Sequence, residues 1–281
     1  MTAGVRRAAV AGSWYPGTAA EIAHEVEGYL AAAAPAPAPA PAPGRLVGLI
    51  SPHAGLRYSG PVAAHGYGLL RERAPRTVVL VGPSHRARFG GVALVAEGAF
   101  ETPLGRAAID EDLAAKLLQQ DPAIVDLPAA HRDEHSLEMQ LPFLQHLRPD
   151  AQILPVLMGR QGRAEVEVLA RALGRVLAGR DALLVASSDL SHYESEAVAY
   201  ELDAAVTAFV GQFDAEGLLG LLLTTSGHAC GGGPMVAVMM AARILGADRA
   251  SVLRYATSGD AGEHDRSRVV GYLSAALWAS R

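Results

Sequence analysis

Residues 46–60 read LVGLISPHAGLRYSG, and this stretch decides the fold that the sequence predicts. Its first five residues form an apolar run that includes β-branched side chains, which is typical of a buried strand. Pro52 disfavours helical dihedral angles at Ser51, and Gly55 permits a tight turn, so the strand is expected to end there. In open α/β sheets the carboxyl ends of the strands border the crevice in which ligands bind. His53 is therefore expected to lie at a ligand site.

The same arrangement recurs twice further along the chain. The apolar residues 78–81 are followed by Gly-Pro-Ser-His at 82–85, and residues 183–186 are followed by Ser-Ser-Asp-Leu-Ser-His at 187–192. Each strand exit thus carries a residue able to bind a metal or to move a proton. We expect the three exits to contribute to one site.

Composition excludes several classes of protein. The chain has 281 residues, of which 50% are apolar and only 5% aromatic, and this composition favours an Ala- and Leu-rich α/β enzyme over a β-sandwich. Its formal net charge of -5 gives no basic field for nucleic acid. No stretch has the length and apolarity of a membrane span, and the N-terminal residues lack the pattern of a signal peptide. We therefore expect a cytoplasmic protein that binds neither nucleic acid nor membrane.

The order of predicted elements indicates a single domain over residues 1–281. Thr18 and Glu21 form a capping box that begins a helix to about Leu30. An alternating Pro/Ala stretch at about 33–44 follows, and we interpret it as a surface loop because the preceding segment is too short to form its own core. Ser59 is expected to cap a helix that runs to about Glu72. In total, the patterns predict roughly six to eight strands interleaved with helices, an α/β layered domain.

A metal site is one interpretation of the histidines at the strand exits. His53 and His85 each follow a predicted strand by a few residues, so neighbouring strands would bring them to a common site, and two imidazoles make a partial shell for Fe(II), Zn or Cu. Cys230, at a Gly-rich helix entrance, is the expected third ligand, and a helix N-terminus or a metal would favour its thiolate. The alternative is that both histidines satisfy loop carbonyls while Cys230 packs in the core. Cys230 is the only cysteine, which excludes an internal disulfide.

Acid/base residues are expected beside the metal ligands. Asp189 and His192 share one predicted turn, so the carboxylate could orient or charge the imidazole. The alternative is that Asp189 or Ser191 caps a helix while His192 is exposed. His135 is predicted on a helix one turn from Glu138, whose face would also carry Glu134, and it either lines the site or supports the helix. A third interpretation is a metal-free hydrolase with Cys230 as nucleophile and His192 or His228 as its base.

Six motifs occur in the order expected of the Memo family. They are AGSWY at 11–15, PHAG at 52–55, GPSH at 82–85, EHSLE at 134–138, SSD at 187–189 and CG at 230–231. From about residue 8 to residue 277 the chain resembles this family, whose bacterial and archaeal members are called AmmeMemoRadiSam system protein B. The resemblance implies the fold of the class III (LigB-type) extradiol dioxygenases, a single α/β domain with a mostly parallel or mixed central sheet between helix layers.

The resemblance also implies roles for individual residues. His53, His85 and Cys230 match metal-binding positions, with iron favoured and copper or zinc as alternatives. His192, Asp189 and His135 match positions in or near the same pocket and are the predicted catalytic residues, His192 being similar to the acid/base histidine of the dioxygenases.

The implied partners are a small-molecule or peptide ligand, together with a radical-SAM protein and a small companion protein. Two positions depart from the family pattern. Arg86 stands where a second histidine is frequent, and Gly232 stands where an arginine often follows the Cys-Gly pair. Both departures change the charge expected at the mouth of the pocket.

Overall fold

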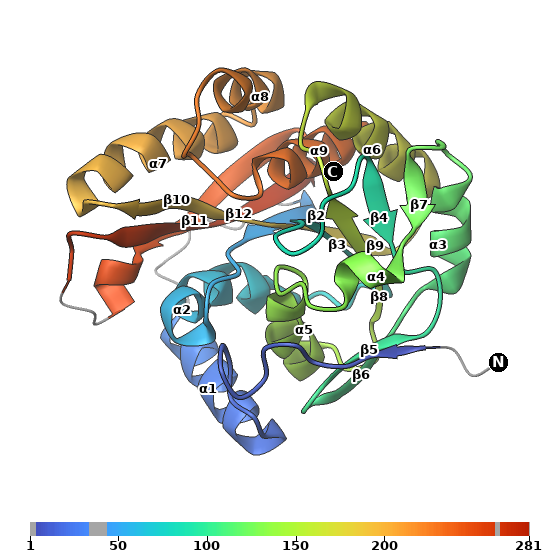
Figure 1. Ribbon diagram of the computed structural model, residues 1–281, viewed down its shortest axis with the longest axis horizontal. Helices are drawn as coiled ribbons and strands as arrows, with labels where there is room; N and C mark the ends of the chain where they lie inside the picture. Colours follow the sequence, from blue (N-terminus) through green and yellow to red (C-terminus); the bar gives the residue numbers. More distant parts are fainter. Residues whose placement is uncertain (1–3, 34–43, 262–264, 281) are drawn as a thin grey trace.

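The computed structural model describes residues 4–33, 44–261 and 265–280. Most of the Pro/Ala-rich stretch predicted as a surface loop therefore lies outside the described residues. Within them, a mixed sheet of nine strands forms the centre of the molecule (Figure 1). The predicted α/β class is confirmed.

The sheet has the strand order β10-β12-β2-β9-β3-β8-β4-β7, and β11 pairs with β12 outside this path. Strands β2, β9, β3 and β8 are parallel, whereas β12 runs antiparallel to β2 and β4 runs antiparallel to β8. The bounds are β2 (Gly44–Ser51), β3 (Thr77–Pro83), β4 (Val92–Leu94), β7 (Ile124–Asp126), β8 (Gln152–Met158), β9 (Ala182–Ser187), β10 (Asp189–Glu194), β11 (Arg249–Thr257) and β12 (Val269–Ser280). A separate small sheet joins β1 (Val5–Arg6), β5 (Ala99–Thr102) and β6 (Gly105–Ala108).

Helices cover both faces of the central sheet (Figure 1). One face carries α2 (Leu56–Tyr67), with α1 (Ala19–Ala32) and α5 (Leu141–Leu147) packed beside it. The other carries α9 (Gly232–Ile244) and α7 (Glu196–Gly211), with α6 (Arg163–Val176), α8 (Ala215–Thr224) and α3 (Glu111–Leu118) around them. Shorter helical segments are α4 (Pro128–His131) and the 3-10 turns η1 (Gly68–Arg71), η2 (Glu138–Gln140) and η3 (Ser258–Ala261).

The strands at the centre of the sheet are buried on both faces. All seven residues of β3 and all six of β9 are buried, as expected for parallel strands between two helix layers. These continuous apolar runs are the features from which the strands were predicted. The parallel pairing of β2, β9 and β3 places their carboxyl ends side by side.

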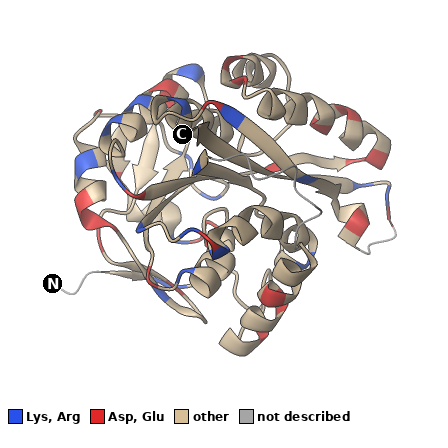
Figure 2. Cartoon of the chain, turned by 180° about the vertical axis from the view of Figure 1, so that it is seen from behind, with Lys and Arg blue, Asp and Glu red and all other residues tan. Residues whose placement is uncertain are grey.

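Charged residues of both signs are interspersed along the helices and strands, as Figure 2 shows. Among the described residues, no helix is both long and apolar enough to cross a membrane.

Side chains cap the first turns of α1 and α3, and the cap of α1 is the predicted one. The side chain of Thr18 accepts the N–H of Glu21 at the start of α1, and Asp110 caps α3 by accepting the N–H of Leu113. The helix predicted to begin after Cys230 is α9, which begins at Gly232.

Three local predictions are wrong. Helix α2 begins at Leu56 rather than after Ser59, because the chain turns into the helix directly at Gly55, and the Ser59 hydroxyl instead donates to the Ala54 carbonyl over 2.8 Å. Glu134 does not share a helical face with Glu138, since it precedes the short turn η2 in a loop. The structure also has twelve strands within its described residues, more than expected, because short edge strands carry little sequence signal.

The fourth difference concerns residues 189–194, which form β10 rather than the predicted turn. This segment pairs with β12 in an antiparallel ladder, so neither Asp189 nor Ser191 caps a helix. The ladder joins two parts of the chain that are far apart in sequence, and local patterns do not report such pairing.

Candidate metal centre and ligand pocket

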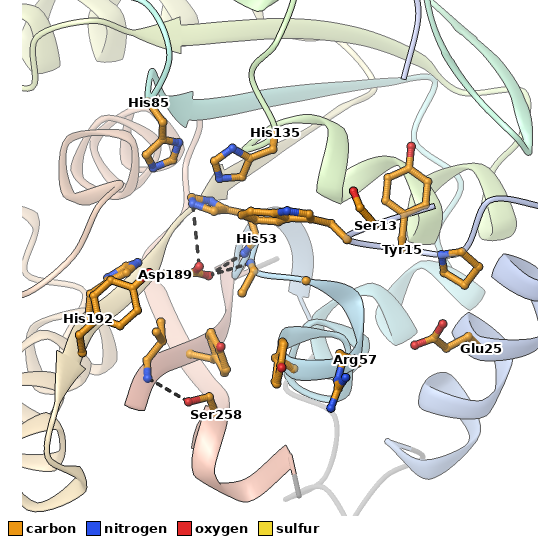
Figure 3. Close-up of a pocket in the computed structure, with 18 of the residues that line it drawn as sticks. Ser13, Tyr15, Glu25, His53, Arg57, His85, His135, Asp189, His192 and Ser258 are labelled. Carbon is orange, nitrogen blue, oxygen red and sulfur yellow. Dashed lines mark hydrogen bonds and ion pairs between the residues drawn. The ribbon is translucent and has the colours of Figure 1, made fainter. Parts of the chain in front are cut away.

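The carboxyl ends of β2, β9 and β3 bring the predicted site residues together (Figure 3). His53 follows β2 and His85 follows β3, while β9 lies between these strands and ends at Ser187. The centroids of the two imidazole rings are 5.2 Å apart. The expectation that the strand exits meet at one place is confirmed. The strands that carry His53 and His85 are not neighbours, however, because β9 pairs with both and separates them.

A hydrogen-bond network fixes the tautomer of His53. Its Nδ1 lies 2.9 Å from the Ser187 hydroxyl, which donates its own proton to the Ser136 carbonyl over 2.6 Å and accepts from Gln140 Nε2 over 2.8 Å. Because the Ser187 oxygen has no proton left to offer, Nδ1 of His53 must be the donor. The lone pair is therefore on Nε2, which lies 3.2 Å from the Cys230 sulfur. Burial lowers the pKa of His53 to about 3, so the ring is neutral.

Glu134 performs the same orienting role for His85. Its Oε1 lies 2.9 Å from His85 Nδ1, and the carboxylate also accepts main-chain N–H groups of His85, Arg86, His135 and Ser136. Burial alone would raise the pKa of Glu134, but these hydrogen bonds outweigh it and hold the pKa below its usual range. A carboxylate that accepts Nδ1–H leaves Nε2 of the imidazole as the metal-binding atom.

Cys230 reaches the same place from the turn that precedes α9. It immediately precedes the Gly231 cap of α9, its N–H donates to the Asp189 carbonyl over 3.2 Å, and its sulfur faces His53. Burial first, and then the negative charge of Asp189, raise the pKa of the thiol. Without a metal ion, these two effects favour the neutral thiol over the thiolate.

The donor atoms fit a metal ion. One ligand atom from each of His53, His85 and Cys230 lies within 4.8 Å of the other two. Two imidazoles and a sulfur are a donor set suited to iron, copper or zinc. His85, Glu134 and His135 form a second group with the same spread, but the Glu134 oxygens are already occupied by hydrogen bonds, so Glu134 serves as support for His85.

A cavity of about 860 Å³ opens over these histidines. His135 stacks on His85 with the ring centroids 4.5 Å apart, and Trp14 packs against His135 at 4.3 Å. Aromatic and charged side chains make up much of the remaining wall, namely Tyr15, Glu25, Arg57, Tyr58, Arg86, Asp189, His192, Tyr193, Arg268 and Tyr272. All the predicted site residues except Cys230, whose sulfur contacts His53 Nε2, line this cavity.

Asp189 and His192 line the pocket together, but their hydrogen bonds lead elsewhere. Asp189 Oδ1 accepts the N–H groups of His53 over 2.7 Å and Ala54 over 3.3 Å, so the carboxylate holds the turn that presents His53. Burial raises the pKa of Asp189, while these donors oppose the shift. Nδ1 of His192 lies 2.8 Å from the Leu190 carbonyl.

The imidazole within hydrogen-bond distance of the Cys230 thiol is not that of His192 or His228, the two residues considered as the base of a cysteine hydrolase. Nδ1 of His228 lies 3.2 Å from the Leu202 carbonyl, and the imidazole beside the thiol is that of His53.

The sequence did not reveal Gln140 or the role of Glu134. The only available signal was the rule that metal-binding histidines require a second hydrogen-bond partner.

The fold and the site together define a class, the α/β proteins with a His-His-Cys cluster at the carboxyl edge of a mixed sheet. The model of the Memo family, described as Memo-like protein, matches residues 6–276. The chain therefore belongs to the Memo family, as its motifs predicted.

Relatives match the chain over nearly its whole length. A MEMO1 family protein of Methanothermobacter thermautotrophicus is 39% identical and covers 95% of this chain and 98% of its own. A MEMO1 family protein of Ignicoccus hospitalis is 38% identical, with 96% and 97% coverage. Among solved structures, the crystal structure of the uncharacterized protein JW3007 from Escherichia coli K12 matches with a TM-score of 0.56 and 16% identity over 82% of this chain and 99% of that one. This last likeness concerns the fold alone.

Proposed function

We propose that this protein binds one metal ion through His53, His85 and Cys230, with Fe(II) preferred over copper or zinc, and carries out redox or oxygen-dependent chemistry on a ligand in the adjoining pocket. The observation that supports it is the convergence of three donor atoms within 4.8 Å from three separate parts of the chain. Two of these donors already have the orienting partners that metal-binding histidines require.

A bound iron ion would supply Lewis acidity and one-electron redox chemistry. The chain itself would supply orientation and proton transfer. Ser187 and Glu134 hold the two imidazoles with Nε2 available, and Trp14 with His135 forms a wall that restricts access to His85.

His192 is the proposed acid/base residue. Since the Leu190 carbonyl can only accept, Nδ1 of His192 carries a proton, and Nε2 is free to take a proton from a ligand. Asp189 would act through the His53 turn, and His135 would contact the ligand beside His85. A sulfur ligand distinguishes this site from the two-His-one-carboxylate sites of many non-haem iron enzymes, and it would place more electron density on the metal.

The metal proposal is tested by metal analysis of protein purified without oxygen. We expect near-stoichiometric metal in the wild type and its loss in Cys230→Ser and His85→Ala. The matched control is His146→Ala, which removes an imidazole that pairs with Glu27 outside the lining of the pocket. Unchanged metal content in Cys230→Ser and His85→Ala, or failure of the wild type to take up Fe(II), copper or zinc, would overturn the proposal.

A second candidate function is non-catalytic binding of a small acidic ligand or peptide in the same pocket. It is favoured by three arginines in the lining, Arg57, Arg86 and Arg268, together with aromatic walls. With benzoate as the probe, Arg86→Gln should weaken binding without changing metal content, whereas Arg88→Gln, an exposed arginine outside the lining, should not. Equal affinities for all three proteins would count against a role for Arg86.

We also propose a cytoplasmic location and transient association with a radical-SAM protein and a small companion protein. A reduced cysteine at the metal site suits a reducing compartment. Co-purification from the native host tests the association, and recovery of neither protein after chemical cross-linking would contradict it.

A further inference from the structure

The strand that carries His192 is irregular on both sides of that residue. Asp189 pairs with Tyr272, His192 with Val270, and Glu194 with Val269. Between each pair and the next, β10 therefore has one residue more than β12, which is the pattern of a β-bulge. Tyr193 has a φ angle of +61°, a left-handed conformation that is rare for a bulky side chain. Such bulges re-aim a side chain near a site.

One peptide group in the first bulge is held at both of its ends. The carbonyl of Leu190 accepts from Nδ1 of His192 over 2.8 Å. The N–H of Ser191 donates to Oδ1 of Asp203 over 2.9 Å. Because these two atoms belong to the same peptide unit, a continuous chain of hydrogen bonds runs from the Asp203 carboxylate through the peptide to the imidazole of His192.

The Asp203 carboxylate is itself held in a closely fitted place. Asp203 lies on α7 and is fully buried, and its Oδ2 accepts from the Tyr255 hydroxyl over 2.8 Å. A Cβ atom at Gly271 of β12 would lie 1.8 Å from that oxygen, so only glycine leaves room for it. The Asp203 carboxylate thus projects from α7, accepts from Tyr255 of β11 and packs against Gly271 of β12. It also accepts from the bulge of β10.

We propose that Asp203 is a positioning residue for His192, which it fixes as the Nδ1–H tautomer with Nε2 turned to the pocket by holding the Leu190–Ser191 peptide. A carboxylate that accepts the peptide N–H polarises the group and strengthens the carbonyl as an acceptor for Nδ1–H. The inference rests on the proposed function in one respect, the acid/base role of His192.

The test is nitrogen NMR of histidine side chains in the full-length, metal-free chain labelled with ¹⁵N, with the His192 signals assigned by their absence in His192→Gln. In the wild type we expect one tautomer, with a protonated Nδ1 and an unprotonated Nε2. Asp203→Ala should give averaged signals of both tautomers, whereas Asp203→Asn, whose amide oxygen can still accept from Ser191, should restore most of the wild-type pattern.

Asp110→Ala is the matched control. Asp110 is also a buried carboxylate that accepts one hydroxyl, from Thr77, and one main-chain N–H, from Leu113, but it lies at the opposite edge of the sheet near the start of β3. It should cost stability without moving the His192 signals.

Unchanged His192 signals in a folded Asp203→Ala protein would overturn the proposal. A wild type whose His192 is protonated at Nε2 would also overturn it, even if the alanine variant does not fold. Neither result depends on bound metal or on turnover. The NMR experiment therefore tests the role of Asp203, whereas the metal content of the variants tests the proposed metal site.

Discussion

At the scale of the residue, the most consequential side chain beside the metal donors is Glu134. Its carboxylate accepts His85 Nδ1–H and several main-chain N–H groups, so it fixes both the ring and the loop. In Glu134→Gln one oxygen becomes an NH₂ group that faces these donors. We expect metal affinity to fall by about 10- to 100-fold, the usual cost of losing such a partner. Competition with a chelator measures it, with Glu201→Gln on an exposed position of α7 as control. Wild-type affinity in a folded Glu134→Gln protein would show that His85 needs no orienting carboxylate.

A second residue-scale prediction concerns His131, which is buried away from the pocket. Burial lowers its pKa to about 4, although the Ala93 carbonyl beside Nε2 opposes the shift. In the unfolded chain the pKa returns to about 6.5. Below that pH the unfolded state binds a proton that the folded state does not, so the free energy of unfolding decreases as the pH falls from about 6.5 to about 4.

His131→Gln should remove this dependence. The neutral amide can still donate to Ala93 but does not titrate, so the loss of stability between neutral pH and pH 4 should shrink by about 3 kcal/mol. Urea unfolding of both proteins at several pH values measures the difference. Parallel pH profiles would mean that His131 is protonated in the folded protein as readily as in the unfolded one.

At the scale of the element, the start of α9 sets the position of Cys230. A Cβ atom on Gly231 would lie 2.4 Å from the Ser187 carbonyl at the end of β9, so Gly231→Ala must push the helix entrance away from the strand. We expect a loss of about 1–3 kcal/mol of stability from overpacking, together with weaker metal binding.

Gly220→Ala is the control for that prediction. Gly220 lies inside α8, and a Cβ there meets nothing within 4 Å, so this variant should gain about 0.5–1 kcal/mol from helix propensity. Chemical denaturation and metal titration of both variants decide the matter. Normal metal binding by Gly231→Ala would show that the close contact of α9 with β9 does not position the sulfur.

The elements also show why prediction from sequence worked for some parts of the site and not for others. His53 and His85 could be placed because an apolar run and a Pro/Gly turn are local signals, and the parallel strands of one sheet end at the same edge. Glu134 could not be placed, because its bond to His85 spans a loop whose path depends on tertiary packing. Residues 189–194 were misassigned for the same reason, since their conformation is set by pairing with β12 and by Asp203.

At the scale of the whole molecule, one buried carboxylate attaches the N-terminal segment to the middle of the chain. Glu138 pairs with Arg6, accepts the N–H groups of Ala9 and Val10, and accepts the Tyr15 hydroxyl over 2.7 Å. Burial and the charge of Glu138 raise the pKa of Tyr15, which keeps that hydroxyl a donor. The segment tied down in this way carries Trp14, so the wall of the pocket depends on this contact.

Glu138→Gln should therefore damage stability and pocket together. The Arg6 side chain is only 8% exposed, and without a carboxylate its charge remains buried and unpaired, which costs about 3–5 kcal/mol. Arg6→Met should cost a similar amount, and the double variant less than the sum, because replacing both partners leaves no isolated charge. Arg71→Gln, which breaks an exposed pair with Glu27, should cost no more than about 1 kcal/mol.

Urea unfolding followed by fluorescence in a Trp278→Phe background isolates the signal of Trp14. In Glu138→Gln this signal should change at lower urea than circular dichroism does, because the segment detaches before the sheet unfolds. If the fluorescence and circular dichroism transitions of Glu138→Gln coincide, and its loss of stability is no larger than that of Arg71→Gln, the pocket wall is held by packing alone.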